Sequence, residues 1–359
     1  MRDVLADYER FTAAGKRFGR AVVTSVWGSA PRPEGSCMLA SADGTIAGSV
    51  SGGCVESATA LEIEAAIERG TPKLVTFGVT DERAWEVGLA CGGTIKVFVE
   101  PMVRPQILEA ARGAGGEVVA SIVTGAGLGE SVGVFENGEI EGKLAIKLPM
   151  DVIRDSALEA LKREASASST FETEDGGVTI FFEVFPKQPR LVIFGAGQLA
   201  VELVPLAKAL GYHTIVADGR KAFLDPDRFP SADELILAWP QEAFARIGLD
   251  SACYICVLSH DPKFDEPALQ VALRSSAAYV GAIGSRKTQA ARRERLREAG
   301  LTETQVERLH GPIGLDLGGR QPVEVALAIL AEMTAVRYGK ASRHTREPRL
   351  LDSGAVGHR

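Results

Sequence analysis

Two glycine-rich loops in the first part of the chain contain residue types that could hold an anionic ligand. The segments GSAPRPEGS at 28–36 and GSVSGGCV at 48–55 are both dense in glycine and serine. Backbone N–H groups and serine hydroxyls in such loops can surround an anion. Arg32 adds a fixed positive charge that can reach a phosphate through two hydrogen bonds. These loops are therefore the first candidates for a ligand site.

Cys54 is the candidate for a reactive group in these loops. It follows Gly52 and Gly53 at the expected start of a helix, and a helix terminus there favours the thiolate form. Cys91, in LACGGT, lies in another glycine turn that leads into a strand. The alternative for Cys54 is a small residue buried in a tight turn, and both interpretations stay open at this level.

A glycine fingerprint in the second half is typical of a dinucleotide-binding turn. The apolar run 191–194 leads directly into GAGQLA, which has the form G-x-G-x-x-A. Gly195 allows the tight turn, Gly197 lets a phosphate approach a helix N-terminus, and Ala200 permits close helix–strand packing. Asp218 lies 21 residues after Gly197 and ends the next strand, where an acid accepts hydrogen bonds from a ribose diol. We expect a Rossmann domain that binds a nucleotide; the alternative is the same fold without a ligand.

His260 is the catalytic candidate of this second half. It follows the apolar run ACYICVLS, at the carboxyl end of a strand, where open α/β sheets bind ligands. An enzyme that transfers hydride needs an acid or base beside its substrate; alternatively, His260 caps a strand–loop junction. Cys253 and Cys256 lie within the same run, so their side chains point to opposite faces. We predict that these two cysteines are buried and structural.

The overall composition excludes several classes of protein. The chain has 359 residues, 45% of them hydrophobic and 24% charged, with a net charge of −7, as in ordinary globular proteins. The negative charge argues against nucleic acid or an anionic membrane as the main partner. Five scattered cysteines form neither a disulfide framework nor an iron–sulfur set. No apolar run approaches the roughly 18 residues of a membrane span, so we expect a cytoplasmic protein with free thiols.

A proline-rich segment at 186–189 divides the chain into two domains. The pattern before it predicts a mixed α/β domain over 1–187, whose strand order the sequence does not indicate. Helices are expected at 3–14, 54–69 and 151–164. Strands are expected at 21–27, 37–40, 45–47, 73–78, 94–99, 117–123, 131–135, 139–145, 169–173 and 178–185.

Strands and helices alternate over 188–338, which predicts a parallel, doubly wound, Rossmann-like sheet. The expected strands are RLVIF, HTIVAD, ELILA, ACYICVLS and AAYVGAIG, and the expected helices are 198–210, 243–247, 264–274, 288–299 and 322–338. The last helix is apolar around much of its circumference, so we expect part of it to contact a second copy in a homodimer. Residues 339–359 are expected to form a mobile basic tail.

Several of these segments together resemble the XdhC/CoxI family. They run in order from about Trp27 to Tyr338 and are GSAPRPEGSCML, GSVSGGCVE, CGG, GAGQLA, AIGSR and PIGLDLGGRQPVEVALAILAE. Members are accessory proteins of molybdenum hydroxylases such as xanthine dehydrogenase and carbon monoxide dehydrogenase. The resemblance implies a chaperone that binds molybdenum cofactor, promotes its sulfuration with a cysteine desulfurase and inserts it into the apo molybdenum hydroxylase.

The resemblance also implies which residues contact the cofactor, with Cys54 as a candidate molybdenum contact. The candidates in the glycine motifs are Arg32, Gly52, Gly53, Cys54 and Cys91. NAD(P) or another nucleotide is the candidate ligand of the Rossmann domain. Two alternatives remain: an NAD(P)-dependent oxidoreductase that uses Asp218 and His260, and a nucleotide-sensing protein without turnover. A maturation factor is favoured over an enzyme with its own turnover.

Overall fold

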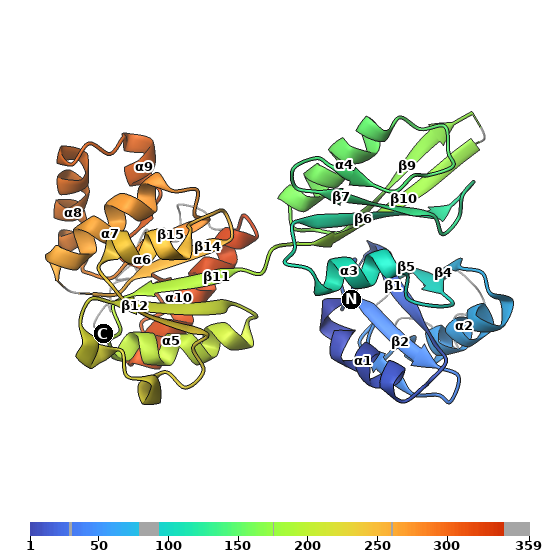
Figure 1. Cartoon of the computed structure of the whole chain (residues 1–359), viewed down its shortest axis with the longest axis horizontal. Coiled ribbons are helices and arrows are strands. Elements are labelled where there is room, and N and C mark those ends of the chain that lie inside the picture. The colour runs from blue at the N-terminus through green and yellow to red at the C-terminus, as the bar shows by residue number, and fades with distance from the viewer. Residues whose placement is uncertain (29–30, 79–92, 175, 260, 341–359) are drawn as a thin grey trace, which may run out of the picture. The chain divides into compact units, whose positions relative to one another are not determined.

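The structure is a computed structural model that describes residues 1–28, 31–78, 93–174, 176–259 and 261–340. It divides into two compact units, Met1–Lys187 and Gln188–Arg359. The first unit contains two antiparallel sheets and the second contains one parallel sheet (Figure 1). Within these described ranges, no helix is long and apolar enough to cross a membrane.

The first sheet of the amino-terminal unit has the strand order β3-β2-β1-β5-β4, with all neighbours antiparallel. Its strands are Phe18–Trp27 (β1), Cys37–Ser41 (β2), Ile46–Gly48 (β3), Lys73–Phe77 (β4) and Thr94–Glu100 (β5). Helix α2 (Glu56–Arg69) packs Ile63 and Ile67 against one face of this sheet. The other face packs partly against a short 3-10 turn and two helices, namely η1 (Arg2–Val4), α1 (Leu5–Ala13) and α3 (Pro105–Arg112).

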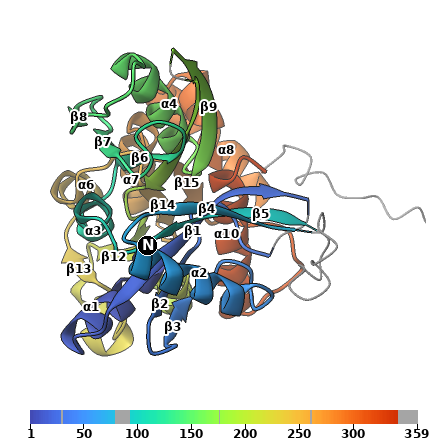
Figure 2. The ribbon, with the colours of Figure 1, turned by 90° about the vertical axis from the view of Figure 1, so that its right-hand side faces the viewer.

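The second sheet of this unit has the order β8-β7-β6-β10-β9 and is also antiparallel. Its strands are Glu117–Thr124 (β6), Ser131–Phe135 (β7), Ile140–Glu141 (β8), Ala167–Thr173 (β9) and Gly176–Phe185 (β10). Val22 and Phe98 of the first sheet share a core with Val123 and Phe181 of the second. Because side chains alternate along a strand, the outer faces remain for α2 and for α4 (Met150–Lys162) (Figures 1 and 2).

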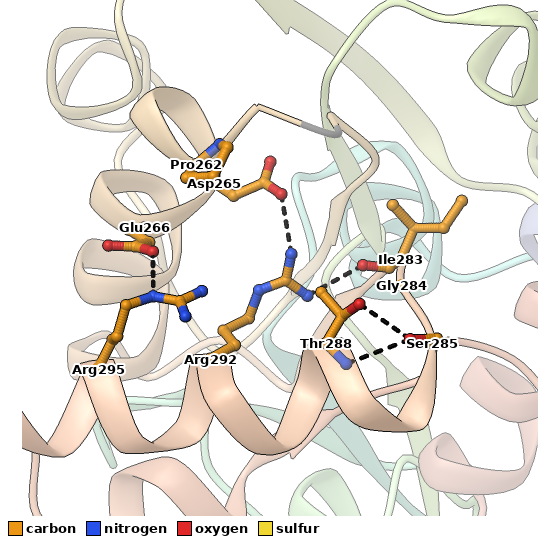
Figure 3. A pocket seen from close by; sticks show the side chains of 9 residues that line it. All are labelled: Pro262, Asp265, Glu266, Ile283, Gly284, Ser285, Thr288, Arg292 and Arg295. Carbon is orange, nitrogen blue, oxygen red and sulfur yellow. Dashed lines mark hydrogen bonds and ion pairs between the residues drawn. The ribbon is translucent and has the colours of Figure 1, made fainter.

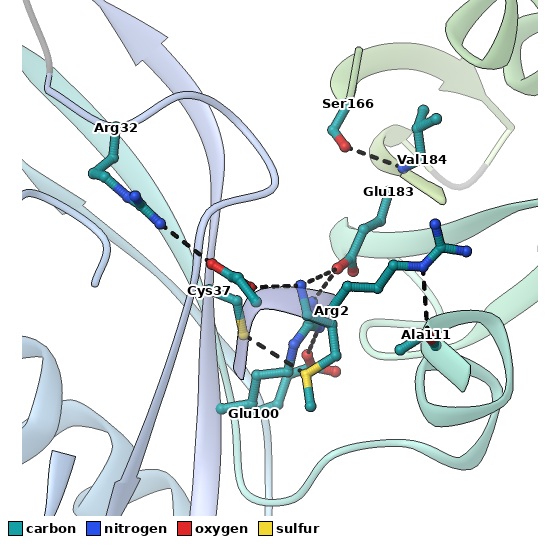
Figure 4. Close-up of polar contacts among 11 residues, drawn as sticks. Arg2, Arg32, Cys37, Glu100, Ala111, Ser166, Glu183 and Val184 are labelled. Atoms are coloured by element: carbon teal, nitrogen blue, oxygen red, sulfur yellow. Dashed lines mark hydrogen bonds and ion pairs between the residues drawn. The ribbon is translucent and has the colours of Figure 1, made fainter. Parts of the chain in front are cut away.

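A buried arginine joins the two sheets of the amino-terminal unit. Arg20 on β1 is 0% exposed. It donates to Glu100 of β5 at 2.6 Å and to Glu183 of β10. Arg104 also donates to Glu100, at 2.6 Å, and to Ser121 of β6, at 2.9 Å. Figure 4 shows Glu100 and Glu183 converging on this centre from different strands. The paired charges thereby fix the position of one sheet over the other.

The carboxyl-terminal unit has a parallel sheet with the order β13-β12-β11-β14-β15-β16. Its strands are Arg190–Phe194 (β11), His213–Asp218 (β12), Glu234–Leu237 (β13), Cys253–Val257 (β14), Tyr279–Ala282 (β15) and Leu309–His310 (β16). Counted within the unit, this order is 3-2-1-4-5-6, as in dinucleotide-binding folds. Ligands of such sheets bind where the order reverses, which here is between β11 and β14.

Helices cover both faces of this parallel sheet (Figure 1). One face packs against α5 (Gln198–Ala209) and α10 (Pro322–Arg337). The other face packs against α6 (Pro240–Ile247), α7 (Pro262–Arg274), α8 (Arg286–Glu298) and α9 (Glu303–Glu307). Two 3-10 turns, η2 (Lys221–Phe223) and η3 (Pro226–Arg228), follow β12.

The predicted fold class is confirmed, and the differences from the sequence-based elements are local. Cys253 and Cys256 lie in cores on opposite faces of the parallel sheet, as predicted. Helix α2 begins at Glu56 and not at Cys54. The strand expected at 139–145 is limited to β8, because Gly142 follows it with a φ of +100° that extended strands do not adopt. Helices α3 and α9 and strand β16 were not predicted, because each is too short to show a clear periodicity.

We expect Arg20→Met to destabilise the protein by about 3–5 kcal/mol, because it removes the arginine that pairs with buried Glu183 and leaves Glu100 with Arg104 alone. Arg163→Met is the control, since Arg163 and Glu159 form an exposed pair within one helical turn that is worth at most about 0.5 kcal/mol. Urea unfolding of both variants at neutral pH measures the difference. If Arg20→Met lowers the free energy of unfolding by less than about 1 kcal/mol, the packing of the two sheets does not depend on the ion pairs of Arg20.

Candidate functional site

The glycine-rich loop before α2 is closed around a carboxylate of its own chain. Glu56 accepts hydrogen bonds from the backbone N–H groups of Val50, Ser51, Gly52 and Gly53, at 2.8–3.2 Å. The hydroxyl groups of Ser49 and Ser51 donate to the same carboxylate, at 2.5 and 2.6 Å. The loop is thus an anion cradle, as its composition predicted, but Glu56 already fills it. A ligand at this loop must therefore be bound by side chains.

The electrostatics of Glu56 follow from these contacts. Partial burial acts to raise its pKa, but the hydrogen bonds from Ser49, from Ser51 and from the backbone outweigh burial and lower the pKa to about 2. A carboxylate that remains ionised at the first turn of α2 also complements the helix dipole. The sequence carried a signal for this contact, because an acid follows the S-x-S-G-G-C-V segment directly.

Cys54 lies on the surface beside this closed loop. Its side chain is exposed, and its backbone N–H donates to the Ser51 hydroxyl at 3.0 Å. A Cβ atom built on Gly52 would lie 3.5 Å from the Pro31 ring, so the segment before Cys54 is adjacent to the Arg32 loop. Gly53 has a φ of +119°, and a Cβ built there would meet nothing within 4 Å. The structure therefore brings the two predicted glycine loops together and leaves open space at Gly53.

Arg32 retains hydrogen-bonding capacity next to this thiol-bearing segment. Its Nη2 donates to Asp3 at 3.3 Å (Figure 4). Its Nε atom is buried, and among the described residues it has no hydrogen-bond partner. The Arg32 side chain as a whole is 37% exposed, so its outer N–H groups remain accessible. A guanidinium suits an anionic group and a thiol suits a soft centre, and here the Arg32 guanidinium is turned toward Asp3.

The other cysteines differ from Cys54 in their surroundings. Cys37 is buried, and burial raises the pKa of its thiol. Cys253 and Cys256 are buried too, and burial raises both of their pKa values. Cys91 lies outside the described residues. Among the described cysteines, Cys54 is therefore the accessible thiol, in contrast to the buried packing residue that the alternative interpretation assumed.

The glycine fingerprint forms a tight turn at the carboxyl edge of the parallel sheet. Gly195 has a φ of +110°, and a Cβ there would lie 2.5 Å from the backbone nitrogen of Ser259, so glycine is required. Gly197 is the N-cap of α5, and a Cβ there would meet nothing within 4 Å. Ala200 is 0% exposed against the sheet. Gly195 and Ala200 thus have the predicted turn and packing roles, and the approach of a phosphate to the start of α5 near Gly197 stays a prediction.

Asp218 lies next to this turn and is held by protein groups. Its Oδ2 atom accepts from the Ala196 backbone N–H and from Arg220 Nη2, and its Oδ1 atom accepts from the backbone N–H and Nε of Arg220. All four distances are 2.9 Å. Burial opposes ionisation, but the hydrogen bonds from Arg220 and Ala196 hold the pKa of Asp218 below its usual value. Arg220, whose place two residues after Asp218 leaves room for a ribose 2′-phosphate by the sequence alone, is thus part of the turn.

A cavity of about 340 Å³ lies further along the same edge of the sheet (Figure 3). Residues from α7, from the end of β15 and from the first turns of α8 line it. Two ion pairs, Asp265 with Arg292 and Glu266 with Arg295, cross it. His260 lies outside the described residues. Within the described part of the chain, no cluster of histidine, cysteine and acidic residues could hold a metal ion by itself.

We expect Glu56→Gln to destabilise the protein by about 2 kcal/mol at neutral pH, because a neutral amide is a weaker acceptor for the loop N–H groups. Folding lowers the pKa of Glu56 from 4.5 to about 2, so the ionised carboxylate stabilises the folded state fully at pH values above 4.5. This stabilisation is lost as the pH falls from 4.5 toward about 2. The difference between Glu56→Gln and the unmutated protein should therefore shrink over that range, as urea unfolding at several pH values measures. Glu64→Gln, at an exposed position of α2, should show neither effect; a constant difference for Glu56→Gln would contradict the assignment.

Comparison with known proteins places both units in one family. The XdhC Rossmann domain matches residues 191–333, and the XdhC and CoxI family matches residues 11–78. A Bacillus subtilis (strain 168) protein named as a probable subunit of xanthine dehydrogenase is 28% identical over 325 residues, which cover 88% of this chain and 92% of that protein. The molybdenum cofactor insertion chaperone PaoD of Escherichia coli (strain K12) is 26% identical over 326 residues, which cover 90% of this chain and 85% of PaoD.

A solved structure has the same fold. It is a crystal structure described as a xanthine dehydrogenase from Bacillus halodurans, and it matches 96% of this chain and 98% of its own chain, with a TM-score of 0.71 and 24% sequence identity. The sequence segments, the parallel sheet with its glycine turn, and the two family matches agree with one another. The chain belongs to the XdhC and CoxI family, and its second unit is the XdhC Rossmann domain.

Proposed function

We propose that this chain is a maturation factor that binds molybdenum cofactor, promotes its sulfuration and inserts it into a molybdenum hydroxylase. The hydroxylase is of the xanthine dehydrogenase or carbon monoxide dehydrogenase type. Family membership supports the proposal, as does the relative named a molybdenum cofactor insertion chaperone. The relative named as part of a probable xanthine dehydrogenase is consistent with action beside such an enzyme.

The observation that carries this proposal is the exposed Cys54 thiol next to the Arg32 loop. Molybdopterin has a phosphate and two dithiolene sulfurs, and in its cofactor form it holds molybdenum. The Arg32 side chain is 37% exposed, and its outer N–H groups can donate to the phosphate. Cys54 is a soft donor for molybdenum or its sulfur. Gly52 and Gly53 leave room for the ligand, and Cys91 is proposed as a further contact.

The proposed partners follow from the same chemistry. The apo molybdenum hydroxylase receives the cofactor, and a cysteine desulfurase supplies the sulfur. We place the reaction in the cytoplasm, where the free thiols of the described cysteines stay reduced. The net charge of −7 disfavours nucleic acid and anionic membranes as the main partners.

We further propose that the Rossmann unit binds a nucleotide at the Gly195 turn. The phosphates lie at the start of α5, near Gly197 and Ala200, and Asp218 supports the turn. The ligand is NAD(P) or the nucleotide portion of a dinucleotide form of the pterin. Binding of such a ligand does not require turnover, so a nucleotide at this site is compatible with the proposed maturation factor.

An NAD(P)-dependent oxidoreductase would have to use Asp218 and His260. The Asp218 carboxylate is engaged by Arg220 and Ala196, and His260 lies outside the described residues, so this alternative has less support. The absorbance of reduced nicotinamide distinguishes the two functions. An oxidoreductase changes that absorbance when a substrate is added, whereas a maturation factor does not.

The outer face of α10 supports the proposed homodimer. Val323, Leu327 and Tyr338 are 46%, 57% and 64% exposed, and their spacing places them on one side of the helix. We expect a mass of twice 38.0 kDa by light scattering at micromolar concentration, and the mass of one chain for Leu327→Arg. Leu210→Arg, at an exposed apolar position at the end of α5, is the control. A single-chain mass for the unmutated protein would exclude the dimer.

We expect Cys54→Ser to reduce bound pterin and the activity of the client hydroxylase, while the folded state keeps its stability. Serine has nearly the same size but offers a hard hydroxyl oxygen in place of a soft sulfur. Cys253→Ser is the matched control, because it buries a new hydroxyl in β14 and should cost stability and not cofactor. The measurement is pterin per protein, after oxidation of the pterin, at matched thermal stability. If Cys54→Ser and the unmutated protein bind equal amounts of pterin, Cys54 does not contact the cofactor.

A further inference from the structure

The carboxylate predicted to bind a ribose is saturated by its own chain. A carboxylate has about four lone-pair sites, and Asp218 accepts four hydrogen bonds from Ala196 and Arg220. Its side chain is 1% exposed. Asp218 therefore has no free acceptor for the two hydroxyl groups of a ribose. The neighbouring group that could contact a ligand is Arg220.

Arg220 is held in one orientation by a salt bridge and by two aromatic rings. Its Nε and Nη2 atoms donate to Asp218. Its guanidinium carbon lies 4.0 Å from the ring centroid of Phe223 and 5.6 Å from that of Phe264. Asp261 is a second acid near Arg220, and its carboxylate caps α7 by accepting from the Lys263 backbone N–H. Because planar guanidinium groups bind in a fixed fork geometry, this support orients the remaining donors.

The outer edge of this guanidinium is available to a ligand. A guanidinium has five N–H donors, of which two serve Asp218. The other three have no hydrogen-bond partner among the residues that the structure describes. The Arg220 side chain is 39% exposed at the carboxyl edge of the sheet. An oriented guanidinium edge of this kind matches two oxygens of a phosphate.

An exposed aromatic platform adjoins the guanidinium. Trp239 is 54% exposed, and its ring lies 4.8 Å from that of Phe264 at an interplanar angle of 34°. The preceding residue, Ala238, donates its backbone N–H to the Asp218 carbonyl, which anchors Trp239 beside the end of β12. A flat base can stack on such an indole face. Asp218 connects Arg220 to the glycine turn, and Phe264 contacts both Arg220 and Trp239.

We propose that the Rossmann unit selects a nucleotide that carries a phosphate monoester on its ribose, with Arg220 as the residue that reads this phosphate. The inference rests on the nucleotide site proposed above and defines its ligand class. The base stacks on Trp239, the 5′-phosphate lies at the start of α5, and the ribose phosphate meets the outer edge of Arg220. Asp218 is a positioning residue, since it acts through Arg220 and the turn.

Calorimetric titration of the full chain tests this specificity. The probes are adenosine 5′-monophosphate, adenosine 2′,5′-bisphosphate and adenosine 3′,5′-bisphosphate, which differ only in the ribose phosphate. A charge-assisted contact predicts that one bisphosphate binds about ten- to hundredfold more tightly than the monophosphate. The two bisphosphates show which ribose hydroxyl carries the phosphate. Equal binding of all three probes would overturn the inference and leave the nucleotide site intact.

Variants assign the effect to Arg220. Arg220→Gln should bind the bisphosphates no more tightly than the monophosphate, and Arg220→Lys should retain part of the preference through its charge. Arg246→Gln removes the same charge from an exposed pair on α6 and should keep the full preference. Trp239→Ala should lower the affinity for all three probes by a similar factor. Thermal melting confirms folding of each variant; a preference that persists in Arg220→Gln would overturn the proposal.

The same titrations separate this inference from the cofactor proposal. If the unmutated chain binds none of the three probes, the nucleotide site and the inference both fail. Pterin loading is measured independently of these probes. A separate nucleotide with a ribose phosphate predicts normal pterin loading in Arg220→Gln. A loss of pterin in that variant, with equal binding of the three probes, would indicate the nucleotide portion of a pterin dinucleotide at this site and would overturn the inference.

Discussion

The glycine loops of both units depend on carboxylates of their own chain. A glycine-rich turn exposes several backbone N–H groups, and such groups are costly when they have no acceptor. Glu56 accepts from four consecutive backbone N–H groups before α2, and Asp218 accepts from Ala196 in the fingerprint turn. Each loop is thereby held in a defined conformation by the protein alone.

This arrangement changes how each loop can recognise a ligand. Loops whose amides are free bind anions through the backbone, whereas the amides before α2 are already engaged. In the first unit, the groups that remain beside the loop are the side chains of Cys54 and Arg32, whereas in the second unit Asp218 engages only the Ala196 N–H of the turn and pairs with Arg220. A thiol and a guanidinium discriminate between ligands more sharply than backbone amides do, because their chemistry and geometry are more specific.

The scaffold of the first unit explains why the two glycine loops meet. Both loops are connected to strands of one sheet, and that sheet is covered by α2 on one side and by the second sheet on the other. Arg20 ties the two sheets together through Glu100 and Glu183. A buried cation between two buried carboxylates tolerates little displacement, because separated charges in an apolar interior are costly. The strands that carry the loops therefore keep a fixed relation to each other.

The sequence by itself determined the parallel sheet of the second unit, the turn at Gly195, the burial of Cys253 and Cys256 on opposite faces, and the family. These features depend on local periodicity, on glycine at required positions and on motif order, which are properties of the linear sequence. Only the tertiary structure decided that Glu56 fills the first anion cradle, that Arg220 saturates Asp218, and that two antiparallel sheets pair around Arg20. Arg20 and Glu183 are 163 positions apart, and no periodicity signals such a contact. Which acceptor satisfies a given donor depends on what folding brings within about 3 Å of it, and spacing along the chain does not specify that.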